Sequence, residues 1–226
     1  MSRVKEYVSV PTELAEVTLT GNQELSPGVH LISWKRNRNF EPGMVVKLTV
    51  NNEIVPRIYS ICSGKDEDEI RVLFHIKEDG LLTPRLARMS EGMKIWVTEP
   101  YGSFLDHKKP AWWIATGTGI APFYSMFRSG IAENRTLIHG GRSLDQFYFK
   151  NEFEHMLADR YIRCCAHESS PGVFPGRVTA YLQGIKDLPP QIDYYLCGKA
   201  LMVVEVRDLL IAKGIPYDHI LSEIYF

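Results

Sequence analysis

The sequence lacks a long hydrophobic run, an excess of charge of either sign, and any grouping of cysteines. Its 226 residues contain no apolar stretch near the ~18 residues that a membrane-spanning helix needs. No apolar segment follows the charged N-terminus Met1–Glu6, so a signal peptide is not expected. With 26 Lys and Arg against 27 Asp and Glu, the net charge of −1 offers nucleic acids and anionic lipids no general attraction. We therefore expect a cytoplasmic protein that binds neither nucleic acids nor membranes.

The cysteines are few and scattered: Cys62, Cys164, Cys165 and Cys197. They form no CxxC pair and have no zinc-type spacing with histidine, so no metal site is expected. Iron–sulfur clusters need grouped thiolates, and disulfides are rare in cytoplasmic proteins. We predict reduced, mostly buried cysteines. Nothing in the composition requires a dimer, and we expect a monomer.

Up to about residue 104 the chain has the pattern of short β-strands separated by turns, which predicts an antiparallel barrel or sandwich. The expected strands are Leu14–Thr20, Val29–Lys35, Met44–Val50, Arg57–Cys62, Ile70–Lys77 and Met93–Thr98. One helix is expected at Thr83–Met89, with Thr83 as its N-cap and Pro84 at its first position.

After residue 110 strands alternate with helices, which predicts a parallel sheet covered by helices and ligands at the carboxyl ends of its strands. The expected strands are Ala111–Ala115, Thr136–His139, Tyr161–Ala166, Tyr194–Cys197 and His219–Glu223. The expected helices are Ala121–Phe127, Phe149–Leu157, Val178–Leu182 and Lys199–Ala212. In the last helix we expect Leu201, Val204 and Leu209 to form one face and Gly214 to stand at the C-cap. Two domains, 1–106 and 107–226, are expected, with a linker at Leu105–Pro110.

Two segments of the first half have anion-binding chemistry. On a strand, Arg57 and Tyr59 share one face, where the guanidinium can clamp a phosphate and the ring can stack on a flat heterocycle. The turn Asp79–Thr83 leads into a helix N-terminus, whose free N–H groups attract anions. Each segment alone is also compatible with an ordinary exposed pair or a capped helix.

The second half has three comparable segments. Ala115–Phe123 is a glycine turn between a strand and a helix, the geometry that holds a dinucleotide pyrophosphate, although it is neither GxGxxG nor a P-loop. Cys197-Gly198 ends a strand, where a thiol can contact a bound ring or simply be buried. The C-terminal run Ser222–Phe226 has aromatic residues at its end, which suggests that it docks in an apolar place.

In this order and spacing, the five segments resemble the ferredoxin–NADP reductase family of flavoproteins over most of the chain, from Phe40 to Phe226. The resemblance implies an antiparallel Greek-key β-barrel that binds FAD, followed by a parallel-sheet α/β domain that binds the nicotinamide dinucleotide. Pro100–Phe104 is similar to the element that closes the barrel, with Glu99 in place of its first glycine. The residues implied to bind FAD are Arg57, Ile58, Tyr59, Ser60, Phe74, His75, Ile76, Gly80, Leu81, Leu82, Thr83, Thr116 and Phe226.

The same resemblance implies residues for the nicotinamide dinucleotide and for the reacting centre. The residues implied to bind NADP are Gly117, Thr118, Gly119, Ile120, Ala121, Pro122, Arg142, His167, Arg177, Cys197 and Gly198. The residues implied around the reacting atoms are Ser60, Cys197, Glu223 and Phe226. The family's Ser-Arg for the 2′-phosphate is replaced by Ala166-His167, so we expect NADPH through Arg177 and leave NADH open.

The resemblance implies hydride transfer between NADP(H) and FAD, and single-electron transfer to or from ferredoxin or flavodoxin. Such carriers are typically acidic, and either of two basic groups is a candidate docking patch: Lys35, Arg36 and Arg38, or Arg85 and Arg88. The alternatives are an NADH-using reductase component of an oxygenase, an electron-transfer subunit of a larger complex, a flavin-binding module without turnover, and an α/β protein without flavin.

Overall fold

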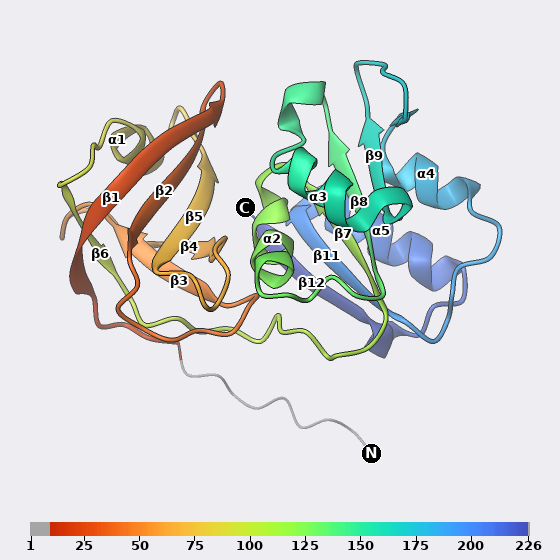
Figure 1. Ribbon diagram of the computed structural model, residues 1–226, viewed down its shortest axis with the longest axis horizontal. Coiled ribbons are helices and arrows are strands. Elements are labelled where there is room, and N and C mark those ends of the chain that lie inside the picture. Colours follow the sequence, from red (N-terminus) through yellow and green to blue (C-terminus); the bar gives the residue numbers. More distant parts are fainter. Residues whose placement is uncertain (1–9, 226) are drawn as a thin grey trace. The chain divides into compact units, whose positions relative to one another are not determined.

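The computed structural model describes residues 10–225, and the chain divides into two compact units between Leu105 and Asp106 (Figure 1). This division lies one residue before the expected boundary. No helix within the described residues is long and apolar enough to cross a membrane.

The first unit is one six-stranded antiparallel sheet in the order β4-β3-β6-β1-β2-β5. A bridge between Ile61, which follows β4, and Val72 of β5 joins the two outer strands and closes the sheet into a barrel. All six expected strands are present, and the first continues to Ser26 through two irregular positions. The strands are β1 (Ala15–Ser26), β2 (Val29–Lys35), β3 (Val45–Thr49), β4 (Arg57–Ser60), β5 (Glu69–His75) and β6 (Lys94–Val97).

The barrel is filled by the inward side chains of its strands, which alternate with outward ones. Ile32 and Trp34 of β2 and Val72 of β5 are fully buried in this core, and Leu86 of helix α1 (Thr83–Ala87) packs into it. The expectation that Thr83 is the N-cap of α1 is wrong. Leu82 is the N-cap, and the Thr83 hydroxyl accepts the N–H of Lys77 at 2.8 Å instead.

The second unit is a six-stranded parallel sheet in the order β10-β9-β8-β7-β11-β12. The strand order reverses between β7 and β11, which is the place where open α/β sheets bind ligands. The short edge strand β10 was not expected from the sequence. The strands are β7 (Ala111–Thr116), β8 (Arg135–Gly141), β9 (Tyr161–Cys165), β10 (Val173–Pro175), β11 (Asp193–Lys199) and β12 (Ile220–Tyr225).

Helices cover both faces of this sheet. On one face, Phe123 of α2 (Ala121–Arg128) stacks on Trp113, and Phe153 of α3 (Lys150–Leu157) contacts Tyr161. On the other face, α4 (Val178–Gly184) and α5 (Ala200–Ala212) share a core with the sheet. All four expected helices are therefore present.

The face of α5 was predicted wrongly. Leu201 and Val204 are exposed by 65% and 37%, and the residues that face the core are Met202, Val203, Val206 and Leu210. The helix is apolar almost all round, so its sequence pattern does not choose a face. The C-cap is Lys213, one residue before the expected Gly214. Gly214, with φ +87°, follows it, and the N–H groups of Gly214 and Ile215 donate to the helix carbonyls of Ile211 and Leu210.

All four cysteines are free and buried, as predicted. Burial raises the pKa of the Cys164 thiol to about 12, so this thiol is protonated and unreactive at neutral pH. Among the described residues, no group of three or more His, Cys, Asp or Glu side chains is placed to hold a metal ion.

Candidate functional site

The segment Arg57–Ser60 forms β4, an outer strand of the first unit. Arg57 is exposed, and within residues 10–225 its guanidinium has no ion pair. Tyr59 is half-buried and meets the ring of Phe74 edge to face, with centroids 6.2 Å apart. Burial raises the pKa of Tyr59 to about 12 against the opposing charge of Arg57, so the phenol stays neutral. Ser60 is buried at the end of the strand, and Ile58 is exposed by 58%.

A compact turn connects β5 to α1. The N–H of Gly80 donates to the carbonyl of Lys77 at 2.8 Å, and a β-carbon on Gly80 would lie 2.9 Å from that carbonyl oxygen. Since Thr83 uses its hydroxyl oxygen to accept the N–H of Lys77, the hydroxyl proton is left for an external acceptor. Leu82 is buried and anchors the turn, whereas Leu81 is 70% exposed.

Two residues that the sequence did not single out touch this region. Asn22 of β1 contacts the end of α1, and His30 of β2 contacts both Asn22 and the ring of Phe74. Neither lies in a motif, and only the pairing of β1 with β2 and of β2 with β5 brings them here. The other expected residues of this strand end, His75 and Ile76, are exposed and half-buried.

The glycine turn follows β7 at the point where the strand order reverses. Gly117 has φ +56° and no atom within 4 Å of a built β-carbon, so it needs the left-handed conformation and borders open space. Thr118 and Gly119 continue as a tight turn to Ile120, the N-cap of α2. The Oγ1 of Thr116 is buried and has no hydrogen-bond partner in the described part of the chain. The Ala121 N–H donates to the Thr118 carbonyl, and the first N–H groups of the turn, which have no partner within it, suit an anion.

The glycine turn lies directly against the end of β11. A β-carbon on Gly119 would come within 2.4 Å of the Cys197 carbonyl oxygen, and one on Gly198 within 2.4 Å of Thr116 Oγ1. Cys197 is fully buried and pairs in register with Ala115 on β7 and with Glu223 on β12. The carboxyl ends of the three strands β7, β11 and β12 thus meet at one place.

Three more expected residues lie side by side at the carboxyl ends of the neighbouring strands. The N–H of His167 donates to the carbonyl of Arg142 at 2.9 Å, and the N–H of Gly176, next to Arg177, donates to Cys165 at 2.7 Å. Arg142, His167 and Arg177 are all exposed, and the two guanidinium groups have no ion pair within residues 10–225. Two positive charges without a counter-ion among residues 10–225 therefore flank a histidine at the carboxyl edge of the sheet.

The loop that carries Arg142 is held from two sides. Gln146 Oε1 accepts the N–H of Arg142 at 2.9 Å, and Glu168 Oε2 accepts the N–H of Leu144 at 2.7 Å. The Glu168 carboxylate therefore already has a backbone partner in this loop. This hydrogen bond holds the loop in place. Glu168 is the one acidic residue of the segment Ala166–Glu168, which follows β9.

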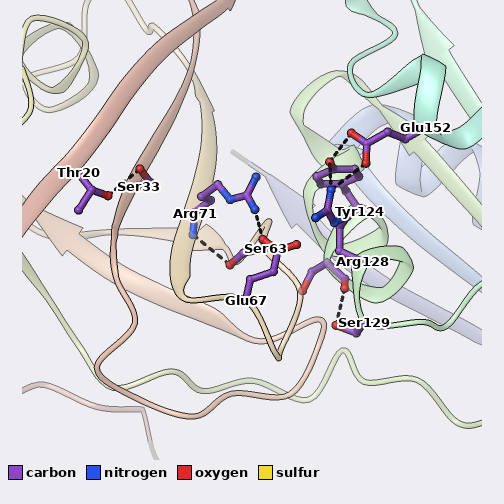
Figure 2. A network of polar contacts seen from close by, with 10 residues as sticks. Thr20, Ser33, Ser63, Glu67, Arg71, Tyr124, Arg128, Ser129 and Glu152 are labelled. Atoms are coloured by element: carbon purple, nitrogen blue, oxygen red, sulfur yellow. Dashed lines mark hydrogen bonds and ion pairs between the residues drawn. The ribbon is translucent and has the colours of Figure 1, made fainter.

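Helix α2, which begins at the glycine turn, is tied to α3 by a polar clamp (Figure 2). The Tyr124 hydroxyl donates to Glu152 at 2.6 Å, and Arg128 Nη1 donates to the other oxygen of Glu152 at 2.9 Å. Phe149, at φ +60°, stacks on Tyr124 with centroids 3.7 Å apart. Burial and the Glu152 hydrogen bond raise the pKa of Tyr124, so its proton stays in this bond. The clamp fixes α2, and with it the turn Gly117–Ile120.

Residues 113–208 match the family model described as an oxidoreductase NAD-binding domain. The toluate 1,2-dioxygenase electron transfer component of Pseudomonas putida is 30% identical over 78% of this chain and 56% of that protein. The ferredoxin–NADP reductase of Azotobacter vinelandii is 29% identical over 85% of this chain and 88% of that protein. A ferredoxin NADP+ reductase structure from Neisseria gonorrhoeae with bound FAD and NADP has a TM-score of 0.85 at 21% identity, over 95% of this chain and all of that one. The chain is similar to the ferredoxin–NADP reductase family over most of its length.

The expected residues fall into groups within each unit. In the first unit, Tyr59 lies by Phe74, and Gly80–Leu82 precede α1, which begins at Thr83. In the second unit, one group is Thr116, Gly119, Cys197, Gly198 and Glu223, and another is Arg142, His167 and Arg177. Phe226, which was expected at the reacting centre, lies outside the described residues.

Proposed function

We propose that this chain is an FAD-dependent reductase that takes hydride from NADPH and passes electrons singly to a small protein carrier. The observation that carries the proposal is the pair of glycines in the turn after β7. Gly117 leaves open space where a β-carbon would be, and Gly119 lets the turn lie on Cys197 and Gly198. This combination of close backbone approach and N–H groups at the start of the turn suits a dinucleotide pyrophosphate.

The side chains of the first unit fit a flavin nucleotide. Arg57 offers an unpaired guanidinium for a phosphate, Tyr59 offers a neutral ring for stacking, and Thr83 offers a hydroxyl proton. In the second unit, the buried, unpartnered Oγ1 of Thr116 fits a polar ligand atom, because buried hydroxyls rarely stay without a partner.

When bound, FAD supplies the chemistry: it accepts a hydride and gives up electrons one at a time. The protein aligns and shields the reacting rings. Arg57 and the turn Gly80–Thr83 bind phosphates, and Tyr59 fixes one ring face. Ser60 in the first unit, and Cys197 and Glu223 in the second, act as hydrogen-bonding or packing groups, without covalent intermediates.

The preference for NADPH is supported by Arg142 and Arg177. Both are exposed, lie at the ends of neighbouring strands, and have no carboxylate partner among residues 10–225, so their charge is left for a phosphate. His167 between them is the residue that weakens the preference, since an ordinary exposed histidine is largely neutral at pH 7. NADH remains the competing donor.

The carrier is proposed to be an acidic ferredoxin or flavodoxin. In the first candidate patch, Arg36 donates to the carbonyl of Lys65 and Arg38 pairs with Glu99. Arg85 and Arg88 of the second patch have no ion pair within the described residues, which favours them for docking. A second candidate function, the reductase component of an oxygenase, is supported by the relative from Pseudomonas putida.

The visible spectrum of the purified protein, followed by anaerobic titration with NADPH and NADH in parallel, tests the proposal. A flavin spectrum bleached at lower NADPH than NADH concentration supports it. Equal or better bleaching by NADH keeps the reductase and favours the oxygenase alternative. A colourless protein that does not take up FAD, or a flavin that neither nucleotide reduces, would refute the proposed function.

A further inference from the structure

Asn22 of β1 closes the C-terminal end of α1. Its Nδ2 donates to three carbonyl oxygens, at 3.2, 3.3 and 2.7 Å: those of Leu86, Ala87 and Met89. The last carbonyls of a helix have no partner within the helix, and here one side chain from a distant strand takes that place. Since α1 has only five residues, it has little stability of its own, and such tertiary contacts set its position.

His30 of β2 links Asn22 to the aromatic pair Tyr59–Phe74. Because Nδ2 of Asn22 donates to the carbonyls, its Oδ1 is the acceptor, and His30 Nδ1 carries the proton of their 2.9 Å hydrogen bond. The His30 ring is 9% exposed and stacks on Phe74, with centroids 5.5 Å apart and an interplanar angle of 13°. Phe74 in turn meets Tyr59 edge to face. A continuous set of contacts therefore runs from the end of α1 to Tyr59.

Helix α1 also borders a pocket. The pocket has a volume of about 290 Å³ and is lined by Ile76, Glu78, Pro84, Ala87 and Arg88. Pro84, Ala87 and Arg88 come after the turn Gly80–Thr83 in the sequence, and Ile76 and Glu78 come before it. A displacement of α1 would therefore move the turn and one wall of the pocket together, whereas Arg57 and Tyr59 lie on a separate strand, β4.

We propose that Asn22 and His30 are positioning residues that make the site selective for the dinucleotide FAD over FMN. This inference rests on the proposed function, in which Arg57 and Tyr59 hold the flavin half and the turn Gly80–Thr83 holds the second phosphate. FMN lacks that phosphate and the adenosine beyond it. Through the position of α1, the contacts of Asn22 thus act mainly on the adenylate half of FAD.

The test is a titration of apoprotein with FAD and with FMN, followed by the change in flavin fluorescence. The variants are N22L, which removes the amide at similar volume, and N22S, which is smaller in case N22L folds poorly. We expect the Kd for FAD to rise about tenfold, the equivalent of one or two lost hydrogen bonds, and the Kd for FMN to change less than about twofold. R57A is the matched control and weakens both flavins.

Two variants of His30 separate its hydrogen bond from its stacking. H30N keeps a donor for Asn22, and H30F keeps a ring on Phe74. We expect H30N to retain more of the FAD affinity than H30F does, because the link to Asn22 acts through the hydrogen bond. Equal Kd changes for FAD and FMN in the Asn22 variants, or no change in either, would overturn the inference. Wild-type protein that binds neither flavin would instead refute the proposed function.

Discussion

Gly119 and Cys197 are in backbone contact: a β-carbon on Gly119 would lie 2.4 Å from the Cys197 carbonyl oxygen. This contact joins the turn after β7 to the end of β11 at the point where the strand order reverses. The neighbouring Gly117 has a different requirement, since its built β-carbon meets nothing within 4 Å but its φ is +56°. One glycine of the turn is thus needed for space and the other for backbone conformation.

The substitutions G119A and G117A are therefore expected to differ. In G119A the methyl group collides with backbone, which cannot move without separating β7 from β11, so nucleotide-dependent flavin reduction should fall more than tenfold. In G117A the left-handed conformation costs about 1–2 kcal/mol, and no contact is lost. Urea unfolding and reduction kinetics of both variants check this. Similar losses in the two variants would contradict the steric role of Gly119.

The strands and the glycine turn were predictable because their signals are local. Alternating side chains mark β2 and β5, and Gly117 and Gly119 stand between a buried strand and a helix. The face of α5 was not predictable, because apolar residues surround the helix and the sheet beneath it decides which ones are buried. Short-range pattern is informative only where one face is polar.

The contacts around the turn after β5 could not be read from the sequence. The role of Thr83 depends on how the chain folds back to Lys77, where a hydroxyl can bond a strand-end N–H as well as cap a helix. Asn22 and α1 are more than sixty positions apart, and only the barrel register brings them together. Arg142 and Arg177, by contrast, were implied by the family resemblance, and both follow strands whose carboxyl ends lie at one edge of the sheet.

Removal of Arg142 or Arg177 should raise the KM for NADPH much more than the KM for NADH. In R142A and R177A, a lost charged hydrogen bond to phosphate costs about 1.5–3 kcal/mol, which raises the KM for NADPH roughly tenfold to a hundredfold. The KM for NADH should change little, because NADH has no 2′-phosphate. Steady-state reduction of ferricyanide with each nucleotide measures both values.

The control is K186A, an equal loss of charge after α4, at the opposite end of the sheet. H167R should lower the KM for NADPH, since it adds a third positive charge to the carboxyl edge of the sheet. Parallel changes for both nucleotides in R142A or R177A would show that the arginine does not discriminate between them.

The start of the second unit is anchored by a buried ion pair. Arg135 Nη2 lies 2.7 Å from Asp106 Oδ1, and the two side chains are only 6% and 9% exposed. R135M leaves a buried carboxylate without its counter-ion and should lower the free energy of unfolding by about 3–5 kcal/mol. D106N retains a hydrogen-bond acceptor and should cost less than R135M does. Urea denaturation of both variants gives the comparison, and equal small costs would show that the pair adds little to stability.

His139 makes the stability of the second unit depend on pH. Burial, with a smaller contribution from the nearby charge of Arg163, lowers the pKa of His139 to about 3 from its ordinary 6.5. Its ring is fully buried, with Nδ1 3.1 Å from the Tyr161 hydroxyl. Between these two pKa values the unfolded chain binds a proton that the folded chain does not. The free energy of unfolding therefore falls as the pH falls through this window, by about 1.4 kcal/mol per pH unit at its steepest.

The variant H139F removes the titrating group and keeps a ring beside Phe147. Between pH 6 and pH 5, wild-type protein should lose about 1 kcal/mol more unfolding free energy than H139F does. Urea denaturation of both proteins at the two pH values measures this difference. The loss of the Tyr161 contact in H139F lowers the unfolding free energy equally at both pH values, so it does not affect the comparison. Identical pH dependence would mean that His139 takes up a proton in the folded state as readily as in the unfolded one.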